Sequence, residues 1–514
     1  MKKDLFKTMN RKKGVIFSYI FMVAEALSSI LYTPFVIRCL GQDEYGVFGL
    51  VATVTAYLHL LDLGVGNAIV RYMVKYRVAK DRRNEQNVLA VTMIFYIIIG
   101  VVVIALGQIL THNVPNLFGE GLTPAQQIIA QKMMKIMVLT AAATLVFAPV
   151  NKTLIAYEHF ALSKVIDIFK LIVKTGLGIV VLLWGGKGVA VVTVNLIAII
   201  LAGLVSLVFV FAKIKLYPKL SKLEKGFLSS ILSYSSLILL QMVATQIAAM
   251  MGQSLIGIFV ASSAGIMALY TIGTQITTYF QSFGMAINGV LMPGITKMVE
   301  NKADKISIQN EMIKVSRLQF AFLGVIFVGF VVCGKEFMLL WAGEGYERSY
   351  PVAIITMIPM LFYLTQYVGT QVLWAMNKHK FQSIAKIIVV TLNIGLTILF
   401  IKITPLIGAA LGMGTALLFG DVVVMNIAFK KDAGISLIAY WKGMFKGILP
   451  CLILSGIVGF LVSFIKLPSV LGMGVQLLAV VGVYGITMLA FGMNTYEKQL
   501  LSKIPIVKNL IRIK

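Results

Sequence analysis

The chain is poor in charged residues, and especially in acidic ones. Only 13% of its 514 residues are charged, with 20 Asp and Glu, whereas 59% are hydrophobic. A soluble particle of this length needs far more polar surface, so the composition excludes an ordinary water-soluble protein. Such a chain requires the lipid bilayer as its solvent.

Motifs for metal binding, disulfide formation and nucleotide binding are also missing. The 3 cysteines lie in or beside apolar runs without paired spacing, and the 4 histidines form no metal-binding pair. The glycine-rich segment 185–188 lacks the spacing of a Walker motif. No catalytic acid cluster is visible. We therefore expect a protein that is not an enzyme and that uses no cofactor and no metal.

Long apolar runs dominate what remains. A helix needs about 20 apolar residues to cross about 30 Å of hydrocarbon, and by that measure the sequence predicts about 14 spans. They cover residues 15–38, 46–70, 88–110, 129–156, 162–184, 188–212, 228–258, 264–292, 317–341, 351–376, 381–403, 406–429, 446–466 and 470–493. No gap between them could hold a soluble domain. We predict an all-α, polytopic membrane protein.

Basic residues recur at both ends of the chain and at every second gap between the apolar runs. The gaps rich in Lys and Arg are 71–83, 213–225, 297–317, 378–380 and 430–446, together with the tail 498–514. Basic loops resist translocation, so we expect these gaps and both termini on the cytoplasmic side. The net charge of +26 is then explained by anionic lipid headgroups and topology, and we expect no nucleic-acid binding.

The N-terminal segment has some features of a secretory signal peptide. Several basic residues precede an apolar stretch that contains Ala24-Glu25-Ala26, which resembles a cleavage site. The acidic Glu25 and the apolar sequence that continues to Leu40 favour an uncleaved first helix instead.

An internal repeat appears when the chain is compared with itself at a shift of about 220 residues. The stretch 154–160 is answered by 373–381, each at a basic gap between two spans, and Gly176 is answered by Gly395. We predict two six-helix lobes, 1–212 and 213–431, followed by two additional helices and a basic tail in 432–514. An even number of spans in each lobe gives the two lobes the same orientation, as in transporters whose halves rock about a central site.

Charged residues inside the fifth span are the first candidates for a binding site, because charge in hydrocarbon is costly. Lys164, Asp167, Lys170 and Lys174 recur along one side of the predicted helix. One interpretation is a cationic wall that attracts a phosphate-bearing headgroup. The other is an internal ion pair between Asp167 and Lys170, with Lys164 reaching the cytoplasmic surface.

Acidic residues within spans are the candidates for ion coupling. They are Glu25 in the first span, Asp62 in the second and Asp167 in the fifth, with Asp421 as a fourth intramembrane acid in the twelfth. Desolvation makes a buried carboxylate easier to protonate, which suits proton uptake. For Asp62 the alternative is a structural hydrogen-bonded role beside His59, and the sequence favours this role, because an isolated intramembrane acid needs partners whether or not it carries an ion.

Uncharged polar residues suit a glycan, which offers many hydroxyl groups and no charge. In the second span Tyr57, Asn67 and Arg71 share one stripe. The second half carries amides and hydroxyls in its first two spans: Gln241, Gln246, Thr274, Thr278, Gln281 and Asn288. Helix packing through Ser and Thr is the alternative reading for the hydroxyls among them.

Short motifs near the N-terminus add a family resemblance. The first span contains Tyr32-Thr33-Pro34, and the second is flanked by Leu40-Gly41-Gln42-Asp43-Glu44-Tyr45-Gly46 and Asp62-Leu63-Gly64-Val65-Gly66-Asn67-Ala68. With the 6 + 6 + 2 layout of spans, this pattern resembles the polysaccharide-transport (Wzx-type) flippases of the multidrug/oligosaccharidyl-lipid/polysaccharide (MOP) superfamily. A buried Arg is lacking in the first and seventh spans, which speaks against the related peptidoglycan-precursor flippases.

The resemblance implies two lobes around a central cavity, alternating access, and a place in a bacterial cytoplasmic membrane. The implied function is the export of an undecaprenyl-pyrophosphate-linked oligosaccharide for a cell-surface polysaccharide such as O-antigen or capsule. The implied partners are this substrate, membrane lipids, and the polymerase and glycosyltransferases of the same pathway. The basic residues that receive the headgroup would be Lys170, Lys174 and Arg71. A cation-coupled multidrug exporter of the same superfamily is the alternative.

Overall fold

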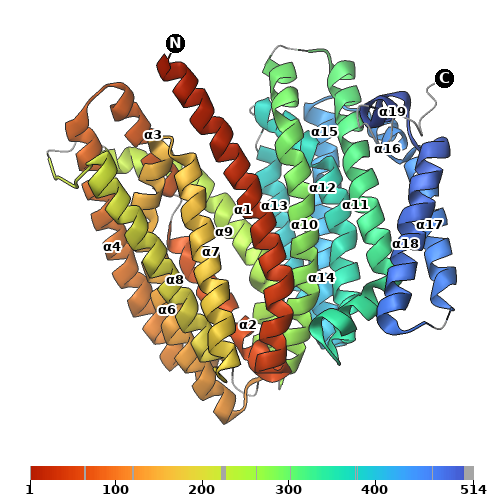
Figure 1. The fold of residues 1–514 in the computed structure, drawn as a ribbon, viewed down its shortest axis with the longest axis horizontal. Coiled ribbons are helices and arrows are strands. Elements are labelled where there is room, and N and C mark those ends of the chain that lie inside the picture. Colours follow the sequence, from red (N-terminus) through yellow and green to blue (C-terminus); the bar gives the residue numbers. More distant parts are fainter. Residues whose placement is uncertain are drawn as a thin grey trace. The chain divides into compact units, whose positions relative to one another are not determined.

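The computed structural model describes residues 2–502, apart from 63–64, 119–120, 222–226, 262, 301–302, 377, 379 and 466. These residues form helices, turns and short connections, and no strand occurs among them (Figure 1). The predicted all-α class is therefore confirmed. The chain forms two compact units, Met1–Ala268 and Leu269–Lys514. The lobes predicted from the repeat, 1–212, 213–431 and 432–514, stay a prediction.

The first unit is built from helices that lie side by side. Its elements are α1 (Lys2–Leu40), α2 (Gln42–Leu58), η1 (His59–Asp62), α3 (Val65–Val78), α4 (Arg82–His112), α5 (Val114–Phe118), α6 (Pro124–Ala156), α7 (Phe160–Leu183), α8 (Gly188–Phe209), η3 (Val210–Ile214), α9 (Phe227–Phe259) and the start of α10 (Ser263–Glu300). The second predicted span, 46–70, is thus two α-helices separated at η1 rather than one continuous helix.

The second unit continues from α10. Its remaining elements are α11 (Lys305–Ala342), η4 (Tyr346–Ser349), α12 (Tyr350–Ala375), α13 (Lys380–Ile401), α14 (Pro405–Leu417), η5 (Leu418–Val424), α15 (Met425–Asp432), α16 (Leu437–Phe445), α17 (Ile448–Ser463), α18 (Ser469–Thr487), η6 (Met488–Gly492) and α19 (Thr495–Ser502). Like η3, η5 and η6 are π-helical, and such segments locally widen a helix and are frequent at functional sites.

The length of the helices agrees with a membrane protein. In the described part of the chain, ten helical segments are long and apolar enough to cross a bilayer, and a bent pair formed by α16 and α17 raises the number to eleven. The predicted count of 14 is not confirmed. The helix α7 is not among the ten, and it is the helix that carries Lys164, Asp167, Lys170 and Lys174.

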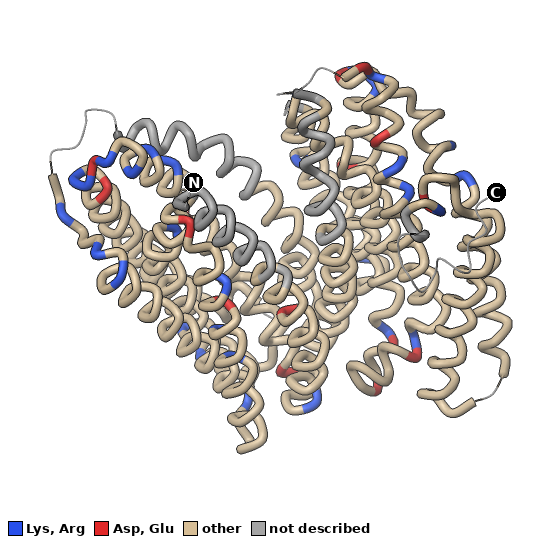
Figure 2. The backbone as a smooth tube through the Cα atoms, turned by 45° about the horizontal axis from the view of Figure 1, so that its top comes forward, with Lys and Arg blue, Asp and Glu red and all other residues tan. Residues whose placement is uncertain are grey.

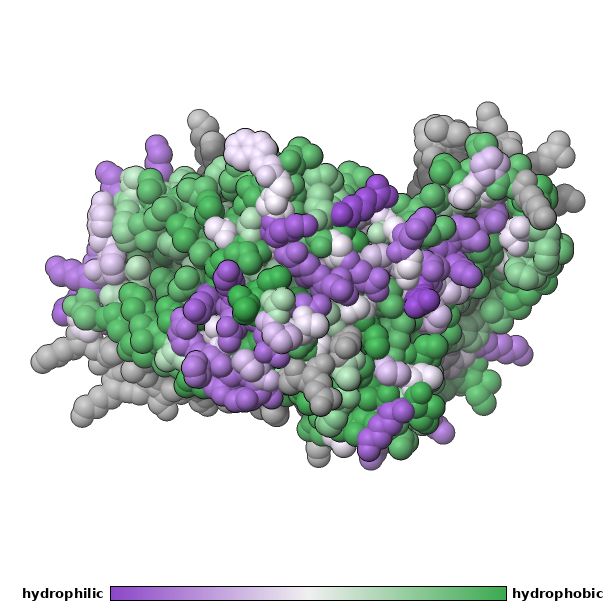
Figure 3. Space-filling model, turned by 90° about the horizontal axis from the view of Figure 1, so that it is seen from below, coloured by the Kyte–Doolittle hydropathy of each residue, from purple (hydrophilic) through white to green (hydrophobic). Residues whose placement is uncertain are grey.

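The surface of the helices is largely apolar. Large side chains such as Leu31, Leu183 and Ile486 expose about 70% of their area (71%, 69% and 70%). In the view of Figure 3, hydrophilic residues gather on parts of the end that faces the reader, with hydrophobic residues around them. An apolar surface of this extent is stable only in contact with lipid, since in water it would drive association.

Small residues and hydroxyl groups join the helices of the first unit. The helices α1 and α7 run side by side (Figure 1), and Ser28 Oγ lies 2.8 Å from Thr175 Oγ1 across their contact. Gly178 of α7 provides the space that the Tyr32 ring occupies, and Gly203 of α8 does the same for Phe147 of α6. Such close approach through glycine is a common way to pack helices in a bilayer.

Candidate anion-binding pocket in the first unit

Asp167 lies between two lysines on α7. Its carboxylate is 3.0 Å from Lys164 Nζ and 3.8 Å from Lys170 Nζ, which are the spacings of ion pairs one helical turn apart. The ammonium group of Lys164 also lies 4.9 Å from the centre of the Phe21 ring of α1. The internal ion pair expected from the sequence is therefore present. It does not remove the positive charge of this face, because one carboxylate serves two ammonium groups.

A pocket of about 400 Å³ opens beside these residues, within the first unit. Its walls come from α1, α6, α7 and α8, and the charged residues that line it are three lysines and one aspartate, with a formal charge of +2. Its polar lining residues are Ser18, Thr144, Asn151, Lys152, Ser163, Lys164, Asp167, Lys170 and Ser206. The volume is in the range of about 300 to 1,000 Å³ that is typical of small-molecule sites.

Lys152 of α6 is a lining residue that the sequence analysis missed. It stands near the end of the fourth predicted span, where a lysine is easily taken for a residue of the basic cytoplasmic rim. Only the packing of α6 against α7 and α8 reveals that it faces the same pocket as Lys170.

Lys174 lies one helical turn beyond Lys170 and does not line the pocket. Its side chain is exposed, and its electrostatic neighbours are Lys170 and Glu25 of α1. The structure thus brings Lys170, Lys174 and two of the predicted coupling acids, Glu25 and Asp167, to the contact of α1 with α7. Their roles in binding and coupling stay predictions.

Asp62 is held by a tyrosine from another helix. It accepts a hydrogen bond from Tyr96 Oη, and Tyr96 is a fully buried residue of α4. This contact favours the structural interpretation of Asp62, and the bonded partner that the structure shows is Tyr96. Arg71 lies on the exposed side of α3.

Two polar contacts join α2 to α9. Tyr57 Oη lies 3.0 Å from Ser254 Oγ, and Thr53 Oγ1 donates to Gln253 Oε1 at 2.6 Å. Gln246 is half-buried on α9. The side chains of the other predicted residues in this region, Asn67 and Gln241, lie outside the described residues.

The predicted hydroxyls of α10 bond within their own helix. Thr274 Oγ1 donates to Tyr270 O at 2.9 Å, and Thr278 Oγ1 donates to Thr274 O at 3.0 Å. Gln281 is half-buried on the same helix, and the side chain of Asn288 lies outside the described residues. Both hydroxyls thus bond to the carbonyl oxygen one turn back in their own helix, and the glycan-facing role of all these residues stays a prediction.

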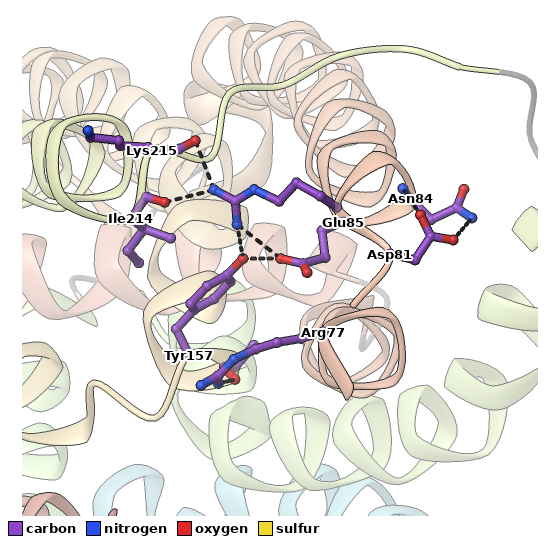
Figure 4. Close-up of polar contacts among 9 residues, drawn as sticks. Arg77, Asp81, Asn84, Glu85, Tyr157, Ile214 and Lys215 are labelled. Carbon is purple, nitrogen blue, oxygen red and sulfur yellow. Dashed lines mark hydrogen bonds and ion pairs between the residues drawn. The ribbon is translucent and has the colours of Figure 1, made fainter. Parts of the chain in front are cut away.

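Three connections of the first unit meet at one end (Figure 4). The guanidinium group of Arg82 donates to Tyr157 Oη at 2.6 Å, to Ile214 O at 2.8 Å and to Lys215 O at 2.9 Å. Tyr157 in turn donates to the buried carboxylate of Glu85. Burial, and then the bond to Glu85, raise the pKa of Tyr157. The alternation of basic gaps predicts these three connections on the same side of the membrane, and they lie together in the structure. Figure 2 shows Lys and Arg gathered at this end of the first unit.

The second unit contains a buried charge pair. Lys386 Nζ of α13 lies 2.7 Å from Asp421 Oδ2 of η5, and Lys386 also lies 5.3 Å from the centre of the Tyr363 ring. Gln366 donates to the backbone oxygen of Asp421 at 2.5 Å. The sequence analysis singled out Asp421 but missed Lys386, whose place inside the eleventh predicted span was the available signal.

Comparisons with known proteins agree with this fold. A family model described as polysaccharide biosynthesis protein matches residues 12–299. The fold is similar to the lipid II flippase MurJ in an inward closed conformation, with a TM-score of 0.69 and 15% identity over 97% of this chain and 99% of that one.

It is also similar to a multidrug resistance MATE family transporter of the MOP superfamily. The inward-facing conformation gives a TM-score of 0.64 with 14% identity over 80% of this chain and 96% of that one. The outward-facing conformation gives 0.56 with 15% identity over 82% and 94%. No curated protein sequence matches. At these identities the structures show the fold, whereas the family model covers more than half of the chain. The chain belongs to the polysaccharide biosynthesis protein family and has the fold of the MOP-superfamily flippases and exporters.

Proposed function

We propose that the protein moves an undecaprenyl-pyrophosphate-linked oligosaccharide from the cytoplasmic to the outer leaflet of a bacterial cytoplasmic membrane. The lobes would alternate between access to each side, and the exported glycan would enter a cell-surface polysaccharide such as O-antigen or capsule. A polymerase and glycosyltransferases of the same pathway are the partners of this reaction. The transporter itself forms no covalent bond.

The cationic pocket of the first unit is the observation that carries this proposal. Three lysines and one aspartate line a cavity among apolar helices, where an uncompensated positive charge is costly. A pyrophosphate headgroup supplies the compensating negative charge through charge-assisted hydrogen bonds. Lys170 in the pocket and Lys174, one helical turn beyond it, would hold the phosphate groups, and Arg71 would make an early contact with the headgroup.

The physical task explains why a protein is required. Sugars and phosphates lose many hydrogen bonds to water when they enter hydrocarbon, so they do not cross the bilayer unaided. Polar side chains replace part of that water, while the lipid tail remains in the membrane. The glycan would contact Tyr57, Asn67 and the uncharged polar residues of α9 and α10 that were predicted from the sequence. Glu25, Asp62 and Asp167 are the candidates for ion coupling.

A cation-coupled exporter of drug-like amphiphiles is the second candidate. The likeness to the MATE family transporter supports it. Substrates that are themselves cationic are disfavoured by a pocket with a formal charge of +2. The positive charge of the pocket therefore favours an anionic substrate over a cationic one.

The test combines export in cells with binding to the purified protein. Cells that lack the gene are complemented with wild type or with the double variant Lys170→Gln and Lys174→Gln, and surface glycan is measured. We expect the double variant to lose export and to bind the lipid-linked pyrophosphate weakly. Export and binding equal to wild type would refute the role of these lysines. The matched control is Lys132→Gln with Lys135→Gln, two exposed lysines of α6 outside the pocket.

A further inference from the structure

We infer that Lys152 and Lys170 form a two-point clamp that selects a diphosphate over a monophosphate. The inference rests on the proposed function and deepens it, because it assigns the two phosphate groups of one headgroup to two different helices. Lys152 belongs to α6, whereas the charged lining residues that were predicted from the sequence, Lys164, Asp167 and Lys170, belong to α7.

The positions of the two lysines in their helices place them at different depths of one pocket. A turn of three residues, 157–159, joins α6 to α7, so the chain reverses direction between them. Lys152 lies four residues before the end of α6, and Lys164 lies four residues after the start of α7. Lys170 lies six residues further along α7, which corresponds to about 9 Å of helical rise.

The Lys152 side chain is confined on its other side by α3. A Cβ atom at Gly66 would come within 2.9 Å of Lys152 Cε, so the lysine stem packs against the bare backbone of this glycine. A side chain at position 66 would push the lysine away. Lys152 Nζ lies 3.6 Å from the same Cβ position, so the end of this side chain is held where α3 meets the part of α6 that lines the pocket.

The charges of the pocket are divided unevenly between its walls. Asp167 pairs with Lys164 and Lys170 on the α7 side. Lys152, on the α6 side, takes part in none of the ion pairs found among the described residues. A monophosphate can satisfy the ammonium groups of one wall. A diphosphate adds a second phosphoryl group that reaches the other wall, where Lys152 supplies the donor.

The experiment compares two soluble probes that differ by one phosphate. Farnesyl diphosphate and farnesyl monophosphate are titrated into the full-length protein in lipid nanodiscs, and the two dissociation constants are measured for each variant. Wild type is expected to prefer the diphosphate. Lys152→Gln is expected to weaken diphosphate binding by about tenfold to about 100-fold, the usual effect of a lost charged hydrogen bond, and to leave monophosphate binding nearly unchanged. Lys152→Arg, which keeps the charge, should preserve most of the preference.

The outcomes separate this inference from the proposed function. If Lys152→Gln keeps the wild-type preference while Lys170→Gln weakens both probes, the clamp is wrong and the phosphate site of the proposed function stands. If neither substitution changes either dissociation constant, both are wrong. An equal loss for both probes in Lys152→Gln, in a protein with wild-type thermal stability, also overturns the selective clamp. Lys132→Gln is the matched control on the same helix.

Discussion

Arg317 of α11 forms a two-point ion pair with Glu497 of α19. Its Nε lies 2.7 Å from Glu497 Oε1, and its Nη2 lies 3.1 Å from Oε2. Both side chains are buried, with 5% and 7% of their area exposed. The same guanidinium group also donates to the backbone oxygens of Gly443, Lys446 and Gly492. One side chain thereby fastens the last helices of the second unit to α11.

Removing Arg317 should therefore loosen this end of the second unit. Arg317→Ala leaves Glu497 and three backbone oxygens without their donor, and a broken buried ion pair costs about 3 to 5 kcal/mol. We expect a large fall in the thermal unfolding temperature of the detergent-solubilised protein. Lys314→Ala breaks the nearby, more exposed pair with Glu311 and should cost at most about 1 kcal/mol. Equal effects of the two substitutions would contradict this account.

The pair of Lys386 with Asp421 should behave as one unit. Their side chains expose only 12% and 3% of their area, so either single substitution leaves a buried charge alone. Lys386→Met or Asp421→Leu should each destabilise the protein by about 3 to 5 kcal/mol, and the double variant by less than either. Unfolding measurements on all four proteins give the coupling energy. Additive effects would show that the two residues act independently.

Two glycines should respond oppositely to alanine. A Cβ at Gly46 of α2 would overlap the backbone oxygen of Ala264 at the start of α10, whereas no atom lies within 4 Å of a Cβ at Gly176 of α7. Gly46→Ala should cost about 1 to 3 kcal/mol through overpacking. Gly176→Ala should stabilise the helix by about 0.5 to 1 kcal/mol. A stable Gly46→Ala protein would exclude the close contact between α2 and α10.

His159 should make stability depend on pH. Burial, and then the charge of Arg77, lower the pKa of this histidine in the turn between α6 and α7. Its ring packs edge-on against Phe209, with 5.4 Å between ring centres. The neutral form of His159 is therefore favoured in the folded state. Its contribution to the stability of the fold is fully present above about pH 6.5, which is the pKa of a histidine in the unfolded chain.

That contribution is lost as the pH falls through the lowered pKa, because the folded protein must then accept a proton. We expect the difference in unfolding temperature between about pH 7.5 and about pH 5.5 to shrink in His159→Gln. His112→Gln, at an exposed residue that ends α4, serves as the control. An unchanged pH dependence in His159→Gln would rule out this histidine as its source.

The sequence predicted the helices well because the bilayer requires a continuous apolar length, which is a local property. The runs at 88–110 and 188–212 coincide with α4 and α8 with its π-helical end. Contacts between helices could not be predicted in this way. The bond from Tyr96 to Asp62 and the place of Lys152 beside Lys170 depend on how α3, α4, α6 and α7 pack. The break at η1 was also missed, although His59, Asp62 and two glycines, Gly64 and Gly66, interrupt the apolar run there.

Flipping by the reconstituted protein tests the central claim most directly. Vesicles containing the wild-type protein are loaded with a fluorescent undecaprenyl-pyrophosphate oligosaccharide, and the fraction that reaches the opposite leaflet is followed over time. We expect wild type to equilibrate the leaflets and the variant with Lys170→Gln and Lys174→Gln to be slower by about tenfold or more. The Lys132→Gln and Lys135→Gln control should match wild type. Flipping at the wild-type rate by the variant with Lys170→Gln and Lys174→Gln would contradict the assignment of the headgroup to these two lysines.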